Sequence, residues 1–260
     1  MSLRSNLRAD MTALLKELRL PAVRACYGEE ADRARREGLS YERYLMEVMS
    51  RESEARRQHA VERLLRQSKL PLEKNLTSFD MERLPLRVRQ QAKVLLDGIF
   101  LDNRENVLAF GNPGSGKTHL LCAIGQELIQ RGRRVLFANC QLLVQSLLAA
   151  KAELKLAKAI KRLSSFEALI IDDIGYVQQN REEMEALFTL LADRYERSSV
   201  MLTSNLPFSK WEQIFKDPMT TAAAIDRLVH HSVILELNVK SYRMEQAGKR
   251  KPASDETPPN

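Results

Sequence analysis

Hydrophobic positions in the first part of the chain recur at the spacing of an α-helix. A run of apolar residues with this spacing stops at Pro21 and predicts a short amphipathic helix. Its members are Leu7, Met11, Leu14, Leu15 and Leu18. Gly38 and Ser40 then separate a second helical stretch from a longer one, YERYLMEVMSRESEARRQHAVERLLRQSKL, which ends before Pro71. We therefore predict a small all-helical N-terminal domain over residues 1–74.

The pattern changes at Asn106. The runs NVLAF, RVLFA, ALIID, SVMLTS and SVILEL are short, apolar and often β-branched, and helical patterns separate the first four. Strands that alternate with helices predict an α/β fold, a doubly wound parallel sheet with helices on both faces. We place this domain at residues 106–243, after a connecting segment, 75–105, with one helix beyond Pro85. Residues 244–260 lack periodicity and contain several prolines, which predicts a disordered tail.

Composition narrows the class of protein. With 260 residues, 44% of them hydrophobic and 29% charged, the chain can bury a core. Its apolar runs fall short of the roughly 18 residues that span a bilayer, and the start MSLRSNLRAD lacks the apolar stretch of a signal peptide, so we expect a cytoplasmic protein without membrane contact. A net charge of +7 mildly favours a polyanionic partner. Three widely spaced cysteines, Cys26, Cys122 and Cys140, predict small buried side chains rather than a disulfide framework or a zinc site.

The stretch GNPGSGKT, residues 111–118, follows a predicted strand and opens a predicted helix. It matches the phosphate-binding pattern G-x-x-x-x-G-K-[ST] in the required context. Glycines let successive backbone N–H groups turn around a phosphate chain, and the helix N-terminus adds partial positive charge. Lys117 can reach the terminal phosphates and the Thr118 hydroxyl can hold Mg²⁺. The predicted nucleotide-binding residues are Gly111, Asn112, Pro113, Gly114, Ser115, Gly116, Lys117, Thr118 and His119, the last of which more often has a structural role at such a position.

Two acids close the predicted strand ALIIDDIG. Ligands of a doubly wound sheet lie at the carboxyl ends of its strands, so Asp172 and Asp173 are expected to face the phosphate loop. Asp172 follows the apolar run directly and is expected to orient Mg²⁺, while Asp173 is placed to align or deprotonate a water. An acidic pair after a strand can also be a turn or a helix cap. Together with the phosphate loop, however, the pair favours hydrolysis over simple binding.

Four segments together resemble the AAA+ ATPases of the helicase-loader branch, and most closely the IstB-type helpers of insertion-sequence transposases. They are GNPGSGKT, LIIDDIG, MLTSNLPF and AAIDRL. The resemblance covers nearly the whole chain, and the N-terminal segment is similar to the IstB appendage. It implies a P-loop AAA+ domain that uses ATP and Mg²⁺ and assembles into a homo-oligomer, a spiral or filament.

The resemblance also assigns residue roles. Asn205 matches the sensor that hydrogen-bonds the γ-phosphate or the water, although an Asn before Leu-Pro is also a common turn residue. Arg227 matches the arginine finger that such ATPases insert into the neighbouring subunit's site; the alternative is a surface pair with Asp226. Arg243 matches a second sensor. Much of the class carries Glu where this chain has Asp173, so slow hydrolysis is expected.

A basic stripe follows the second predicted strand. Lys151, Lys155, Lys158 and Arg162 stand at spacings of 4, 3 and 4, which puts them on one face of a predicted helix whose apolar face holds Leu156, Ile160 and Leu163. A solvated lysine face is the ordinary explanation. The resemblance favours contact with nucleic acid instead. Because the sequence contains no recognisable base-reading module, we expect contacts to the DNA backbone with little sequence preference.

These observations predict an ATP-dependent helper that oligomerises on duplex DNA and assists a transposase in selecting or remodelling target DNA. The alternative within the class is a replicative helicase loader that acts on single-stranded DNA. A small-molecule P-loop kinase would leave Arg227 and the helical appendage unexplained. An interaction protein without enzymatic activity would not use a nucleotide at all.

Overall fold

The computed structural model describes residues 2–175, 181–215 and 218–242, which form two compact units. The first is Met1–Arg63 and the second Leu64–Asn260, so the division lies inside a helix, α3 (Tyr41–Ser68), whereas the boundary proposed from the sequence follows residue 74. The end of α3 and the chain after it belong to the second unit. Leu70 is buried there, and the Gln126 side-chain amide donates to the carbonyls of Pro71 (3.2 Å) and Lys74 (3.0 Å).

The first unit is helical, as predicted. It consists of α1 (Ser2–Glu17), α2 (Pro21–Glu37) and most of α3. Pro21 is the first residue of α2, where its missing N–H costs nothing, and Gly38 ends the helix in the left-handed conformation, φ 65°. The carboxylate of Glu52 accepts from the backbone N–H groups of Ala22 (2.8 Å) and Val23 (3.2 Å), so α3 caps the start of α2.

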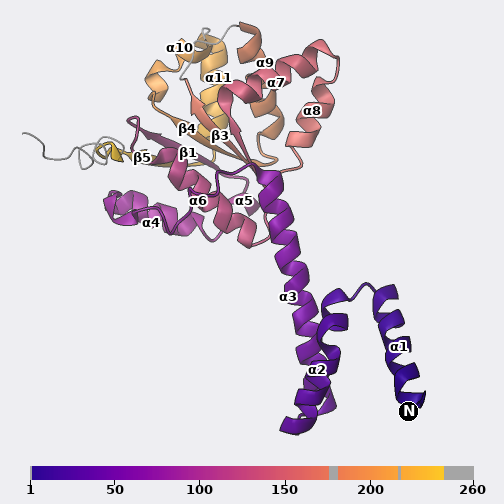
Figure 1. Cartoon of the computed structure of the whole chain (residues 1–260). Coiled ribbons are helices and arrows are strands. Elements are labelled where there is room, and N and C mark those ends of the chain that lie inside the picture. The colour runs from indigo at the N-terminus through magenta and orange to yellow at the C-terminus, as the bar shows by residue number, and fades with distance from the viewer. Residues whose placement is uncertain (1, 176–180, 216–217, 243–260) are drawn as a thin grey trace, which may run out of the picture. The chain divides into compact units, whose positions relative to one another are not determined.

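The second unit contains the predicted parallel sheet (Figure 1). Its strands coincide with the five apolar runs and pair in the order β2-β3-β4-β1-β5. Their bounds are β1 (Asn106–Gly111), β2 (Val135–Asn139), β3 (Ala168–Ile174), β4 (Ser199–Ser204) and β5 (Ser232–Leu237). The carboxyl ends of β3, β4 and β1 are neighbours, so side chains that follow these strands meet at one edge of the sheet.

Helices cover both faces of this sheet, which confirms the doubly wound architecture. Figure 1 shows α4 (Leu86–Leu95), α5 (Ile99–Asp102) and α6 (Lys117–Gln130) on one side. The other side carries α7 (Cys140–Ala152), α8 (Leu156–Leu163), α9 (Arg181–Arg194), α10 (Glu212–Phe215) and α11 (Pro218–Val229). Two short 3-10 turns, η1 (Met81–Arg83) and η2 (Phe208–Lys210), complete the described elements. The main core lies between the sheet and the α7, α9 and α11 layer.

The prediction that a single helix carries the basic stripe is wrong. Helix α7 ends at Ala152, the chain turns at Leu154 with φ 58°, and α8 begins at Leu156. The N–H of Lys155 donates to the carbonyl of Ala150 (2.7 Å), which closes the helix end with a non-glycine residue in the left-handed position. The stripe is therefore divided between two helices. The expected apolar face of α8 is confirmed, since Ile160 and Leu163 are buried.

Two of the three cysteines, Cys122 and Cys140, are buried as expected, whereas Cys26 is half-buried. None of the three forms a disulfide with another described residue. Burial raises the pKa of the Cys122 thiol to about 12, so it is protonated and unreactive at neutral pH. Among the described residues, no helix is long and apolar enough to cross a membrane.

Candidate active site

The loop between β1 and α6 needs glycine for steric reasons. Gly111 has φ 152° and Gly114 has φ 78°. A Cβ atom at Gly111 would lie 2.5 Å from the carbonyl oxygen of Leu237, and one at Gly114 would lie 2.2 Å from the hydroxyl of Ser241. These approaches come from the end of β5 and from the chain after it, which therefore pack directly on the loop. The loop then enters α6 at Lys117, so the helix N-terminus points at it.

Lys117 stands over this loop. Its side chain is buried, and its ammonium donates to the carbonyls of Gly111 (2.8 Å) and Asn112 (2.9 Å). The hydroxyl of Ser115 is also buried and has no hydrogen-bond partner among the described residues. A buried cation and a buried hydroxyl in a glycine-rich loop suit phosphate oxygens.

The carboxylate of Asp172 joins three structural elements. One of its oxygens, Oδ1, accepts from the hydroxyl of Thr118 on α6 (2.7 Å) and from the hydroxyl of Thr203 on β4 (2.7 Å). Asp172 itself is on β3 and is only 8% exposed. The structure therefore brings together the two predicted Mg²⁺ ligands, Thr118 and Asp172. Thr203 is a third member that the sequence analysis missed, although its place near the carboxyl end of a buried strand was a signal.

A break in the pairing of β3 with β4 sets the position of Asp173. Between Ile171 and Ile174 the register of β3 against β4 shifts, and Asp173 has φ 60°. Its backbone N–H donates to the Thr203 hydroxyl (2.8 Å) instead of to a strand carbonyl. A bulge of this kind redirects a side chain that would otherwise alternate with its neighbours. As a result, Asp172 is buried and Asp173 is exposed in the adjacent cavity.

That cavity has a volume of about 340 Å³. Nine of its lining residues were predicted, and both the connecting segment before α4 and Tyr242 complete the wall. The predicted nine are Pro113, Gly114, Ser115, Gly116, Lys117, Thr118, His119, Asp173 and Asn205. The backbone N–H of Tyr242 donates to the carbonyl of Gly114 (3.0 Å), and the Arg83 guanidinium lies 4.9 Å from the centre of the Tyr242 ring. Phe79, Arg83 and Tyr242 were not predicted from the sequence; the one signal for them was an aromatic residue in the polar stretch NLTSFD.

His119 lines the same cavity and ties the connecting segment to α6. Its Nε2 atom lies 3.1 Å from both the Ser78 hydroxyl and the carbonyl oxygen of Asn75. Its ring meets the Phe79 ring edge-on, with centroids 5.0 Å apart. These contacts give His119 a structural role at the wall of the cavity.

Arg227 lies elsewhere. Its backbone carbonyl is within reach of the Asn106 side-chain amide (3.4 Å), and Asn106 begins β1, whereas the phosphate loop follows the end of β1. The Arg227 guanidinium donates to the carbonyl of Ala223 (2.9 Å) and lies 5.0 Å from the centre of the Phe188 ring. Arg227 thus stands at the opposite edge of the sheet from the cavity of its own subunit. Arg243, the other predicted sensor, is outside the described residues, as is the predicted disordered tail.

Comparison with known families decides the class. Residues 13–250 match the family described as "IstB-like ATP binding protein". The chain belongs to this IstB-like family. Its expected resemblance to IstB-type helpers is confirmed, and this IstB-like protein is an ATPase.

Curated relatives agree over most of their length. The IstB-like chain is 42% identical over 240 residues to a predicted insertion-sequence ATP-binding protein from Sinorhizobium fredii, covering 92% of this chain and 80% of that one. It is 36% identical over 240 residues to the predicted ATP-binding protein of insertion sequence IS21 from Pseudomonas aeruginosa, with 92% and 91% covered.

Solved structures share the fold. The DnaC helicase loader superposes with a TM-score of 0.55 at 18% identity, covering 65% of the IstB-like chain and 97% of DnaC. The AMPPCP-bound DnaA of Aquifex aeolicus superposes with a TM-score of 0.56 at 19% identity, covering 70% and 56%. At these identities the likeness shows the P-loop AAA+ fold.

Thr203 offers a test of the hydrogen-bond arrangement around Asp172. Thr203→Val keeps the side-chain volume but removes both the donor to Asp172 and the acceptor for the Asp173 N–H. We expect the ATPase rate to fall about 10-fold or more, since loss of a group that orients a ligand commonly costs this much. The rate is measured by phosphate release at saturating ATP and Mg²⁺.

Thr203→Ser restores the hydroxyl and should restore most of the rate. Thr189→Val, at an exposed site on α9, is the matched control and should be unaffected. Equal rates for the Val and Ser variants of Thr203 would show that the hydroxyl does not position Asp172.

Proposed function

We propose that this chain hydrolyses ATP with Mg²⁺ at the subunit interfaces of a homo-oligomer on duplex DNA, and thereby assists a transposase in DNA transposition. The observation that carries the proposal is the contact between Thr118 and Asp172 (2.7 Å) beside a cavity lined by Lys117 and Asp173. The printed names of the relatives, which are ATP-binding proteins of insertion sequences, support the connection to transposition.

The residues present fit Mg²⁺. A threonine hydroxyl and a carboxylate are hard oxygen donors, which Mg²⁺ prefers, and both come from rigid elements. Thr118 and Asp172 would hold the ion, directly or through its waters. When bound, Mg²⁺ neutralises charge on the terminal phosphates. Thr203 keeps the Asp172 carboxylate in place for this task.

Two further residues suit the attacking water. Asp173 and Asn205 line the same cavity from the ends of adjacent strands, β3 and β4. A carboxylate can accept a proton from water, and an amide can donate to a phosphate oxygen or orient the water. In this proposal Asp173 is the base and Asn205 the sensor. Lys117, held at the loop carbonyls of Gly111 and Asn112, supplies the positive charge that binds the phosphates.

Separate variants distinguish binding from hydrolysis. Lys117→Ala should abolish nucleotide binding, because it removes the buried cation of the loop. Asp173→Asn should bind ATP normally and hydrolyse it at least about 100-fold more slowly, because the base is lost. Binding is measured with a fluorescent ATP analogue and turnover by phosphate release; Asp97→Asn, an exposed acid that does not line the cavity, is the control. Normal turnover by either variant would overturn the assignment.

The position of Arg227 supports catalysis between subunits. Its own cavity lies beyond the full length of β1, so it cannot contact the nucleotide of its own chain in this arrangement. A planar guanidinium with permanent charge suits the charge that develops on a transferred phosphoryl group. We infer that Arg227 reaches the cavity of a neighbouring copy, which makes each site incomplete without a second subunit.

Mixing two inactive variants tests this arrangement. Arg227→Ala should bind ATP and hydrolyse it poorly, whereas Lys117→Ala keeps an intact finger beside an unusable site. A mixture should regain part of the wild-type ATPase rate, because a Lys117→Ala subunit can lend Arg227 to an intact neighbouring site. Co-assembly of the two variants is verified by light scattering or cross-linking. If they co-assemble and the rate stays flat, Arg227 does not act in a neighbouring site.

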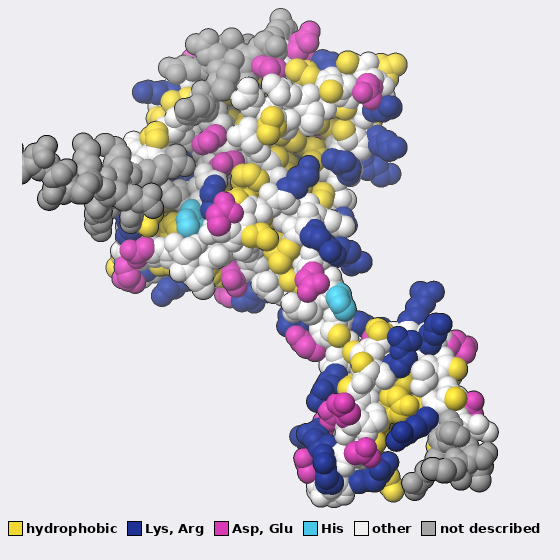
Figure 2. Space-filling model, in the orientation of Figure 1, with side chains coloured by type: hydrophobic (Ala, Val, Ile, Leu, Met, Phe, Trp, Pro, Cys, Tyr) yellow, Lys and Arg dark blue, Asp and Glu magenta, His cyan; other side chains and the backbone are white. Residues whose placement is uncertain are grey.

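The basic residues of α7 and α8 support contact with DNA. Figure 2 shows Lys and Arg side chains gathered on the side of the second unit where α8 lies in Figure 1. Lys151 has an acidic neighbour in Glu185 (3.7 Å) and Lys155 in Glu153 (2.8 Å), and all four side chains are about half exposed or more. Lys158 and Arg162 have no ion-pair partner among the described residues. Exposed cations of this kind contact phosphates without reading bases.

The triple variant of Lys151, Lys155 and Lys158 to alanine tests this surface. In the wild type, ATP-dependent assembly should raise the affinity for duplex DNA steeply, because each added subunit repeats the contacts. The triple variant should keep nucleotide binding and lose DNA affinity. Its slope of log affinity against log salt should be shallower by about 0.9 for each phosphate contact removed. Binding is measured by fluorescence anisotropy across a salt series, with and without ATP.

A charge-matched control variant and single-stranded DNA as a second ligand show whether the effect is specific to this surface and to duplex DNA. Arg87, Lys93 and Arg131 are exposed cations on the opposite helix layer, and their triple alanine variant should bind DNA as the wild type does. An unchanged slope for the Lys151, Lys155, Lys158 variant would make the stripe an ordinary solvated surface. Stronger binding to single-stranded than to duplex DNA would favour the helicase-loader alternative.

A further inference from the structure

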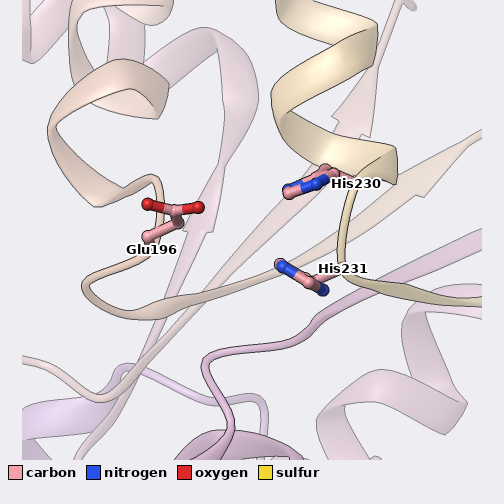
Figure 3. A group of neighbouring side chains, drawn as sticks. All are labelled: Glu196, His230 and His231. Carbon is pink, nitrogen blue, oxygen red and sulfur yellow. The ribbon is translucent and has the colours of Figure 1, made fainter.

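Three metal-ligating side chains meet on the surface of the second unit, away from the nucleotide cavity. Glu196 follows α9, and His230 and His231 link α11 to β5. One ligand atom from each of the three lies within 4.8 Å of the other two. Figure 3 shows both imidazole rings extending toward Glu196 from the facing segment of chain.

The backbone around these residues is anchored. Glu196 has φ 55°, and its carbonyl accepts from the guanidinium of Arg104 (2.9 Å). The His231 carbonyl accepts from the N–H of Asn106 (2.7 Å), and the His230 N–H donates to the carbonyl of Asp226 (3.0 Å). Glu196 and His231 are therefore held by contacts to other parts of the fold, and His230 is held by the end of α11.

We propose that Glu196, His230 and His231 form a binding site for a divalent transition-metal ion, with Zn²⁺ as the best match. Two imidazoles and one carboxylate are a donor set that Zn²⁺ binds and that Mg²⁺ and Ca²⁺, which prefer oxygen, do not. With metal–ligand distances near 2.1 Å, tetrahedral geometry sets ligand atoms about 3.4 Å apart, so ligand atoms that now lie within 4.8 Å of one another would approach by up to about 1.4 Å. Three protein ligands leave one coordination position open.

Tyr195 supplies a supporting contact. Its hydroxyl lies 3.0 Å from Nδ1 of His230, and the rings are tilted with centroids 6.1 Å apart. In metal sites, a hydrogen bond to one ring nitrogen fixes the ring and leaves the other for the ion. Nearby, the buried Arg194 donates to the carbonyls of Leu163 (3.0 Å) and Ser199 (2.8 Å), which fixes the end of α9 just before Tyr195 and Glu196.

The charge around the site limits its affinity. Glu196 and His231 share a groove of about 220 Å³ with Arg104 and Arg227. These two guanidinium groups repel a cation, although Arg227 is drawn toward Phe188 and the carbonyl of Ala223. We therefore expect a dissociation constant on the order of micromolar, weaker than that of a closed structural zinc site. Since His230 stands shortly after Arg227 on the same helix end, a bound ion would also hold the segment that carries Arg227.

Metal titration of the full-length protein tests the site. The protein is first stripped with a chelator, then titrated with ZnCl₂ by calorimetry and with CoCl₂ by visible absorption, both without ATP, which itself binds Zn²⁺, and in excess Mg²⁺ to compete at Thr118 and Asp172. The wild type should bind one ion with a micromolar constant and show the d–d bands of nitrogen-ligated Co²⁺. His231→Ala and Glu196→Gln should each weaken binding at least about 10-fold.

Two controls separate this site from other donors on the chain. His59→Ala removes an exposed histidine of α3, and Cys26→Ser removes the thiol that is not fully buried; both should bind metal as the wild type does. ATP binding by every variant shows that it is folded. The proposal is overturned if the wild type takes up no Zn²⁺ at micromolar concentrations, or if His231→Ala and Glu196→Gln bind it with unchanged stoichiometry and affinity.

Discussion

The carboxylate of Asp172 is the contact on which the rest of the site depends. One of its oxygens accepts from the hydroxyls of Thr118 and Thr203, each at 2.7 Å. Asp172 lies in β3, Thr203 in β4, and Thr118 in the helix that follows β1. The strands β3, β4 and β1 are consecutive in the sheet. A buried carboxylate with two donors fixes the mutual position of the phosphate loop and the two strand ends. The same Thr203 hydroxyl accepts from the Asp173 N–H and so sets the exposed acid beside the buried one.

The cavity beside this contact is closed by chain segments that are far apart in sequence. Phe79 and His119 meet at one wall, and Tyr242 binds the loop through the Gly114 carbonyl at another. Arg83 joins these walls, because its guanidinium lies over the Tyr242 ring and donates to the carbonyl of Lys240 (3.3 Å). A nucleotide in the cavity would thus contact the segment that leads out of α3 as well as the end of β5. The free energy of nucleotide binding can therefore stabilise both the first and the last segments of the ATPase unit.

The two edges of the sheet have different tasks in our proposals. The carboxyl edge holds the phosphate loop with Lys117, and Asp173 at the end of β3, while the opposite edge holds Arg227 and the Glu196 cluster. A strand of fixed length keeps these edges apart within one subunit, so an Arg227 that acts on a nucleotide acts on a neighbour's. The proposed metal site stands at that same edge. An ion there would stiffen the surface that, in our proposal, meets the next subunit.

The sequence by itself determined the elements whose signals are local. Apolar β-branched runs defined the strands, and the glycine pattern before Lys117 defined the phosphate loop, because side-chain type and backbone freedom act over a few residues. The tertiary structure alone decided features that depend on pairing across the chain. The bulge that turns Asp173 into the cavity arises from the register of β3 against β4. The helix break at Leu154 is not predicted from the sequence, because no glycine stands there. Phe79 reaches the cavity, and Glu196 reaches two histidines, only because the packed sheet brings distant segments together, which is a property of the whole fold rather than of any local stretch.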